Sequence, residues 1–189
     1  MTGSFARELI AGATGTTARG AVPYLGMALR GRPAGAGLTF RAAALGLATG
    51  GRSSLGLAAP TLTSPVAGPA KKLAALAALA GELVIDKLPG TPPRTTAGPL
   101  TARLAMGAAG AGLLAGREEA GAGLPVAAGI AGAAAGSFGG LAWRRWASSR
   151  MPDRQAALIE DGAWLLLAAV ACRPDRQRTA RPAPAVVPR

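Results

Sequence analysis

The longest uncharged stretch of the chain runs from Ala120 to Trp143 and contains 24 residues. As one α-helix it would be about 36 Å long, which is enough to cross a hydrocarbon core of roughly 30 Å. A surface helix of a soluble protein normally carries a polar face, whereas this stretch offers only Ser137. Arg144 and Arg145 follow directly, as at the cytoplasmic end of a membrane span. The stretch therefore predicts a membrane-spanning helix.

The composition favours the same environment for most of the chain. Half of the 189 residues are hydrophobic and only 16% are charged, against about 25% in soluble domains. Aromatic residues make up 4% and glycines number 28, a mixture that disfavours strands and favours closely packed helices. We expect an all-α, polytopic membrane helix bundle without β-sheet over residues 5–172, followed by a basic disordered tail over residues 173–189.

Other apolar runs are weaker candidates for spans. The runs at residues 9–29, 33–51 and 97–116 each contain one arginine. A central arginine costs about 2.5–3.5 kcal/mol on insertion, and each leucine returns only about 0.3–0.6 kcal/mol. To enter a membrane, each of these segments must therefore bury its arginine against protein or place it near the end of the span.

The remaining segments are short or broken. Residues 53–70 contain three prolines and are predicted to form a loop or an irregular approach to a helix. Residues 73–85 and 156–172 predict short helices. In all we expect four to six embedded helices, some of them re-entrant.

The positive charge has a membrane interpretation. The formal net charge is +12, which in a soluble protein would suggest nucleic acid as a partner. The basic residues cluster beside apolar runs, as at Lys71 and Lys72, and basic loops around spans are retained in the cytoplasm. We expect a multi-pass protein of the cell membrane, with the lipid bilayer as its partner, anionic lipid at the basic loops and tail, and no nucleic acid.

The residue inventory excludes common catalytic and metal sites. The chain has no histidine and a single cysteine, Cys172, so an internal disulfide, a Cys/His zinc site and a Ser-His-Asp triad are all excluded. We expect no catalytic residue, no metal and no cofactor. The least favoured class is a membrane enzyme whose carboxylates hold a metal ion.

Acidic residues at helical spacing indicate a polar interior. Glu82 and Asp86 lie four residues apart, so both carboxylates project from one helical face, beside Lys87. Ionisable groups in a membrane usually serve a cavity, an ion path or each other. The alternative is a helix end at the interface, where charged side chains reach into water.

Further charges follow downstream. Arg94 and Thr95 precede a helix that contains Arg103, and Glu160 and Asp161 are expected at the N-terminus of the last apolar helix, which favours negative charge. The predicted polar path consists of the acids, bases and threonine that would share this interior, namely Glu82, Asp86, Lys87, Arg19, Arg94, Thr95, Arg103, Glu160 and Asp161.

Three glycines within the longest uncharged stretch predict close helix packing. Gly132, Gly136 and Gly140 form two overlapping G-x-x-x-G steps, which let another helix approach closely. The partner helix could belong to the same chain or to another subunit of a homo-oligomer.

Several motifs together carry a family resemblance: Gly12-Ala13-Thr14-Gly15 with Thr17 and Arg19, the block from Glu82 to Pro89, Arg94-Thr95-Thr96, Pro99-Leu100-Thr101-Ala102-Arg103, and Pro152-Asp153 leading to Glu160-Asp161. With these the chain resembles small bacterial integral membrane proteins catalogued as domain of unknown function 4126. The resemblance covers roughly residues 5–172 and implies a multi-span membrane protein with no assigned reaction.

Two functions remain open from the sequence. The first is a transporter or channel-like unit for a small solute or ion, with the polar path lining its route. The second is a structural or assembly protein that associates through its glycine faces and touches anionic lipid with its basic tail.

Overall fold

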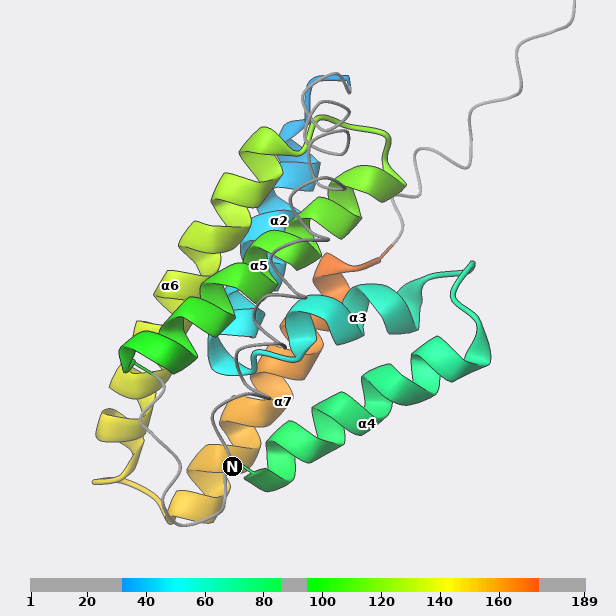
Figure 1. The fold of residues 1–189 in the computed structure, drawn as a ribbon. Coiled ribbons are helices and arrows are strands. Elements are labelled where there is room, and N and C mark those ends of the chain that lie inside the picture. Colours follow the sequence, from blue (N-terminus) through cyan, green and yellow to red (C-terminus); the bar gives the residue numbers. More distant parts are fainter. Residues whose placement is uncertain (1–31, 86–94, 174–189) are drawn as a thin grey trace, which may run out of the picture.

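The computed structural model describes residues 32–85 and 95–173, which form six α-helices and no β-strand (Figure 1). The helices are α2 (Ala36–Gly51), α3 (Leu55–Thr63), α4 (Pro69–Ile85), α5 (Ala97–Arg117), α6 (Gly123–Ala147) and α7 (Asp153–Ala171). A single isolated bridge in this part of the chain pairs Arg32 with Ala120. The all-α prediction is confirmed for these residues.

Most predicted helices have a counterpart. The apolar runs at 33–51, 97–116 and 120–143 correspond to α2, α5 and α6, and the short helices at 73–85 and 156–172 correspond to α4 and α7. The run at 9–29 and nearly all of the predicted tail lie outside the described residues.

The prediction of a loop or an irregular approach to a helix holds for residues 53–54 and 64–68 and is wrong for residues 55–63, because α3 occupies them with Pro60 inside the helix. Pro60 cannot donate a hydrogen bond to the carbonyl of Gly56, and that carbonyl lies against Gly110 of α5. Pro69 is the first residue of α4, where a missing N–H costs nothing. Only Pro65 falls in the connecting turn.

Among the described helices, the most extensive contact joins α2 to α6. A Cβ atom at Gly136 would overlap the carbonyl oxygen of Leu47, and one at Gly132 would overlap the carbonyl oxygen of Ala43. From the other side, Gly46 and Gly50 approach the backbone of α6 in the same way. The helices therefore meet backbone to backbone, as small residues at membrane helix interfaces permit.

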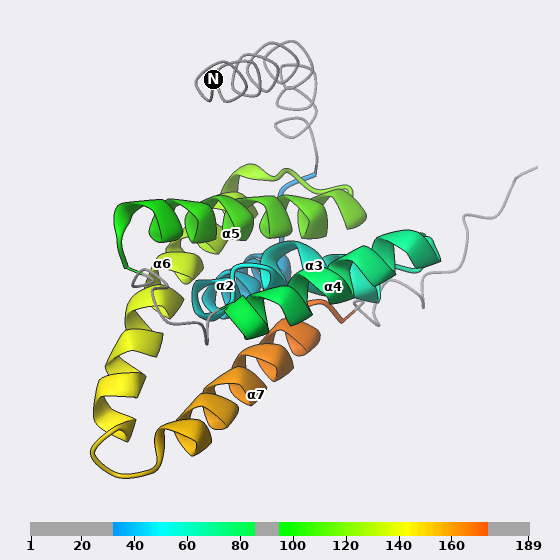
Figure 2. The same cartoon turned by 60° about the horizontal axis from the view of Figure 1, so that its bottom comes forward.

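The remaining helices are arranged around this pair. The α5 helix packs on both α2 and α6, α7 packs on α2, and α3 packs on α5. The α4 helix runs beside α3 at the edge of the bundle (Figure 1), and none of its residues is buried. Figure 2 shows α6 and α7 diverging from the turn that connects them.

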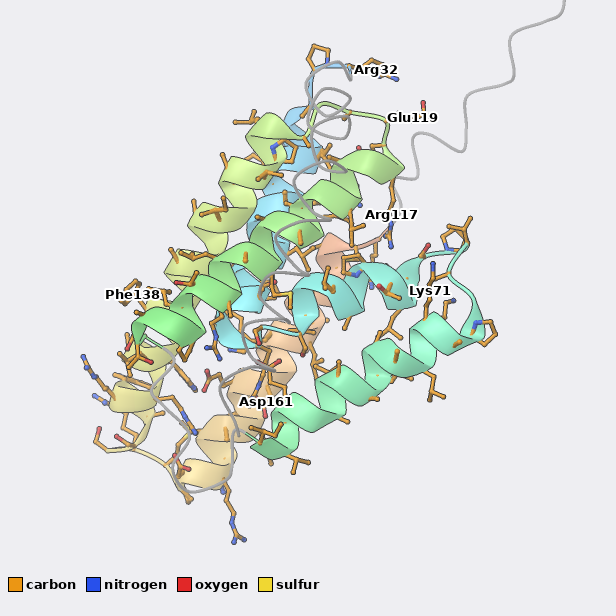
Figure 3. All side chains as sticks on the ribbon, viewed as in Figure 1. Arg32, Lys71, Arg117, Glu119, Phe138 and Asp161 are labelled. Carbon is orange, nitrogen blue, oxygen red and sulfur yellow. The ribbon has the colours of Figure 1, made fainter. Side chains whose placement is uncertain are left out.

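The buried side chains are small. In the described part of the chain, the only large aliphatic or aromatic side chains in the core are Leu38, Leu45, Leu55 and Leu114, and the other buried apolar side chains are alanines, Pro60, Pro125 and Cys172. Many large apolar side chains point outward instead, among them Phe138 on α6, which is 55% exposed (Figure 3).

One described helix, α6, is long and apolar enough to cross a membrane. It contains 25 residues and ends in Arg144, Arg145, Trp146 and Ala147. It includes most of the uncharged stretch that predicted a span.

A methyl group added to Gly136 should destabilise the α2–α6 contact. We expect Gly136→Ala to lower the free energy of unfolding by about 1–3 kcal/mol, because the new Cβ must displace the backbone of α2. Thermal unfolding of the purified protein measures this.

Gly139 supplies the matched control on the same helix. A Cβ at Gly139 meets no atom within 4 Å, so Gly139→Ala should leave the melting temperature unchanged or raise it slightly. Equal melting temperatures for the two variants would contradict the described packing of α2 on α6.

Candidate functional site

The carboxylate of Glu82 lies at the N-terminus of α3. Its Oε1 accepts hydrogen bonds from the backbone N–H and the hydroxyl of Ser53, both at 2.7 Å. Its Oε2 accepts from the backbone N–H of Ser54 at 2.8 Å and from the Ser54 hydroxyl. A helix N-terminus has unsatisfied N–H groups and a partial positive charge that favour an anion. Glu82 therefore fastens the end of α4 to the start of α3.

Arg103 supplies the positive charge of this site from α5. Its Nη2 lies 3.9 Å from Oε1 of Glu82, and the two side chains are 7% and 13% exposed. At this distance the two groups form an ion pair without a direct hydrogen bond. Because both side chains are largely buried, each charge partly offsets the cost of burying the other.

A groove of about 990 Å³ lies between α3, α4 and α5, and this pair forms part of its lining. Its walls are mostly small or apolar side chains, such as Leu57, Ala78 and Met106. Lys71 lines it near the start of α4 (Figure 3), and Glu82 lines it near the end of the same helix. A mainly apolar groove with a few convergent polar groups is typical of small-molecule sites.

A second ion pair lies next to the first along the chain. Arg52, which directly precedes Ser53, donates from Nε and Nη2 to Oδ1 of Asp161 on α7, the former at 2.9 Å. The two side chains are 8% and 13% exposed. The short connection between α2 and α3 thus binds one acid of α4 and one of α7.

Glu160 belongs to a separate cluster between α6 and α7. Its Oε2 lies 3.4 Å from Nε of Arg144, and its Oε1 accepts a hydrogen bond from Nε1 of Trp164 at 3.3 Å. Arg144 also pairs with Asp153 at 3.1 Å. The N-terminal position expected for Glu160 and Asp161 is wrong, because α7 begins at Asp153 and both acids lie in its interior.

The structure brings together two members of the predicted polar path, Glu82 and Arg103. Asp161 and Glu160 pair with cations that the sequence did not single out. Thr95 lies two residues before α5. The other four members lie outside the described residues: Asp86, Lys87, Arg94 and Arg19.

Sequence reasoning missed Arg52, Ser53, Ser54 and Arg144 as site residues. A serine directly before an apolar run is a helix-start signal, and the order Arg52-Ser53-Ser54-Leu55 contains it. The surrounding prolines concealed that signal. Arg144 was assigned to the membrane interface only, because nothing in the sequence indicates that α7 folds back onto it.

Neither a search for metal-binding clusters nor a comparison with known proteins assigns a role to these residues. Within residues 32–85 and 95–173, no three His, Cys, Asp or Glu side chains lie close enough to hold a metal ion. The chain matches no protein-family model, no curated protein and no solved structure at a significant level.

Breaking the Arg52–Asp161 pair should destabilise the fold strongly. We expect Arg52→Met and Asp161→Leu each to cost about 3–5 kcal/mol, because each leaves an uncompensated buried charge, while the double variant should cost much less than their sum. Denaturant unfolding, followed by tryptophan fluorescence, measures this cycle.

The exposed pair of Arg144 and Asp153 provides the comparison. Asp153 is 78% exposed, so Asp153→Ala should change the free energy of unfolding by about 1 kcal/mol or less. Additive effects of Arg52→Met and Asp161→Leu would show that the two side chains do not form the pair described above.

Proposed function

We propose that this chain is a multi-pass membrane protein whose α3–α4–α5 groove binds a small solute as part of a transporter or channel-like unit. The supporting observation is the combination of exposed apolar side chains, buried charged side chains and a groove whose lining includes Glu82 and Arg103. The family resemblance noted from the sequence implies the same location and is part of this proposal.

The distribution of side chains favours lipid as the solvent. In the described part of the chain, seventeen large hydrophobic residues are exposed, on α2, α3, α4, α5, α6 and α7 and in the turn after α3. Charged residues lie inside, where Arg52, Arg103 and Glu160 are each about 5–6% exposed. Soluble monomers rarely expose apolar patches beyond a few hundred Å², and intramembrane charges face the interior of a bundle.

Ion pairing reduces the cost of placing these arginines in a bilayer. Arg41 pairs with Glu118 and also donates from Nε to the carbonyl of Ala171 at 2.8 Å. Arg103 pairs with Glu82. Arg41 and Arg103 are the arginines of the apolar runs at 33–51 and 97–116, and both side chains contact protein. Their pairing allows α2 and α5 to enter the membrane beside α6.

The groove suits a solute with an apolar body and a charged end. Its apolar walls would cover the body, and the side chains of Glu82 and Arg103 would orient the charge. Because the pair contains one negative and one positive side chain, it can bind a cationic or an anionic ligand when the contact between Glu82 and Arg103 lengthens. Substituting either residue should reduce transport or binding while membrane insertion persists.

The alternative, a structural or assembly protein, loses its main support. Gly132 and Gly136 pack against α2 of the same chain, and Gly140 is also buried. These glycines are therefore not needed to explain contact between subunits. A homo-oligomer would have to use another face of the bundle.

Membrane residence has a direct test. We expect the full-length protein, expressed without detergent, to sediment with membranes at high speed and to resist extraction at alkaline pH, because its exterior is apolar. Immunoblotting of the two fractions measures this. Recovery as a compact monomer in the supernatant would refute the membrane proposal.

The groove can be probed before any substrate is identified. In a Cys172→Ser background, we expect Ala78→Cys to react in intact membranes with both a cationic and an anionic methanethiosulfonate reagent, because Ala78 lines the groove. Ala80→Cys on the same helix, which is outside the groove lining, should react much more slowly, since a thiol facing lipid forms little thiolate.

Charge substitutions at the polar end should change the selectivity of that labelling. Adding Glu82→Gln should favour the anionic reagent roughly tenfold, and adding Arg103→Gln should favour the cationic reagent to a similar extent. Equal labelling at Ala78→Cys and Ala80→Cys, or selectivity that ignores both substitutions, would contradict a solute-binding groove.

A further inference from the structure

The turn between α6 and α7 is rich in arginine. Residues 144–154, here called the basic turn, contain Arg144, Arg145, Arg150 and Arg154 against the single acid Asp153. Arg144 is neutralised within the protein by Asp153 and Glu160. The other three arginines are exposed, and no carboxylate of the described residues pairs with any of them. The basic turn thus presents three uncompensated positive charges.

An exposed tryptophan lies among these charges. Trp146 is 47% exposed, and the guanidinium of Arg150 lies over its ring, 4.5 Å from the centroid. Arg150 also donates from Nη1 to the carbonyl of Trp146 at 3.1 Å. The ring centroids of Trp143 and Trp146 are 5.2 Å apart. Nε1 of Trp143 donates a hydrogen bond to the carbonyl of Ala156 on α7. These contacts hold the arginine and the two rings in a defined arrangement.

The position of the basic turn relates it to the bilayer. It lies at the C-terminal end of α6, the described helix that is long and apolar enough to span a membrane. In Figure 2 the turn stands at the meeting point of α6 and α7, away from α3 and α4. Tryptophan and arginine at the end of a span are typical of the headgroup region.

We propose that the basic turn is a docking surface for anionic phospholipid headgroups. The three exposed arginines would bind the phosphates, and Trp146 would lie at the boundary between headgroups and acyl chains. A lipid is favoured over nucleic acid because the charges adjoin the exposed apolar surface of α6, which includes Phe138 and Ile130. This inference rests on the proposed membrane residence and is independent of the groove.

Brominated lipids test the proposal through tryptophan fluorescence. The protein is reconstituted into two kinds of vesicle, both made of equal amounts of phosphatidylglycerol and phosphatidylcholine. In the first the bromine is on phosphatidylglycerol, and in the second it is on phosphatidylcholine. We expect stronger quenching by brominated phosphatidylglycerol, because two of the three tryptophans lie in or next to the basic turn. An arginine near an anionic surface contributes about fivefold in lipid affinity.

Substitutions of the basic turn give the decisive comparison. The variant Arg145→Ala, Arg150→Ala, Arg154→Ala should lose the preference for phosphatidylglycerol, whereas Arg145→Lys, Arg150→Lys, Arg154→Lys should keep most of it. Lys72→Ala removes a charge from α4, which carries no tryptophan, and should not change the preference that tryptophan quenching measures. High salt should weaken the preference of the unmodified protein.

The outcomes separate this inference from the membrane proposal. Quenching by neither brominated lipid would show that the protein does not enter the bilayer. Equal quenching by both, or an alanine variant that retains the full preference, would overturn the lipid-docking surface and leave membrane residence intact.

Discussion

The contact between the backbones of α2 and α6 determines where the other helices can lie. Because Gly46 and Gly50 face Gly129, Ala133 and Ser137 without intervening side chains, the two helices approach as closely as backbones allow. The hydroxyl of Ser137 donates across this contact to the carbonyl of Gly50 at 3.3 Å. Packing that relies on dispersion and polar contacts between small residues works in lipid, where burial of apolar side chains gives no advantage over contact with acyl chains.

This close packing leaves the ion pairs as the specific connections between the outer helices. The short link after α2 is their centre: Arg52 reaches α7 through Asp161, and Ser53 and Ser54 reach α4 through Glu82. A link of three residues therefore positions two helices that are remote from each other in sequence. The groove owes its polar end to the same link, since both serines and Glu82 line it.

Much of the helical architecture followed from apolar runs and their interruptions. The positions of α2, α5 and α6 could be predicted because long Ala/Gly/Leu segments have few other stable conformations. The α3 helix could not, because local propensity at Pro60 opposes a helix and only its packing on α5 compensates. The pairing of Glu82 with Arg103 could be anticipated from their chemistry, whereas the partners of Glu160 and Asp161 depend on how α7 folds back, which no local pattern encodes.

The absence of any buried residue in α4 has a consequence for access to the groove. Among the described helices, α4 makes its main contact with α3 alone. The hydrogen bonds of Glu82 to Ser53 and Ser54 hold its C-terminal end, and Leu79 packs against the core. Local opening of α4, hinged at the turn after α3, would therefore give access to the groove while the other described helices keep their mutual contacts.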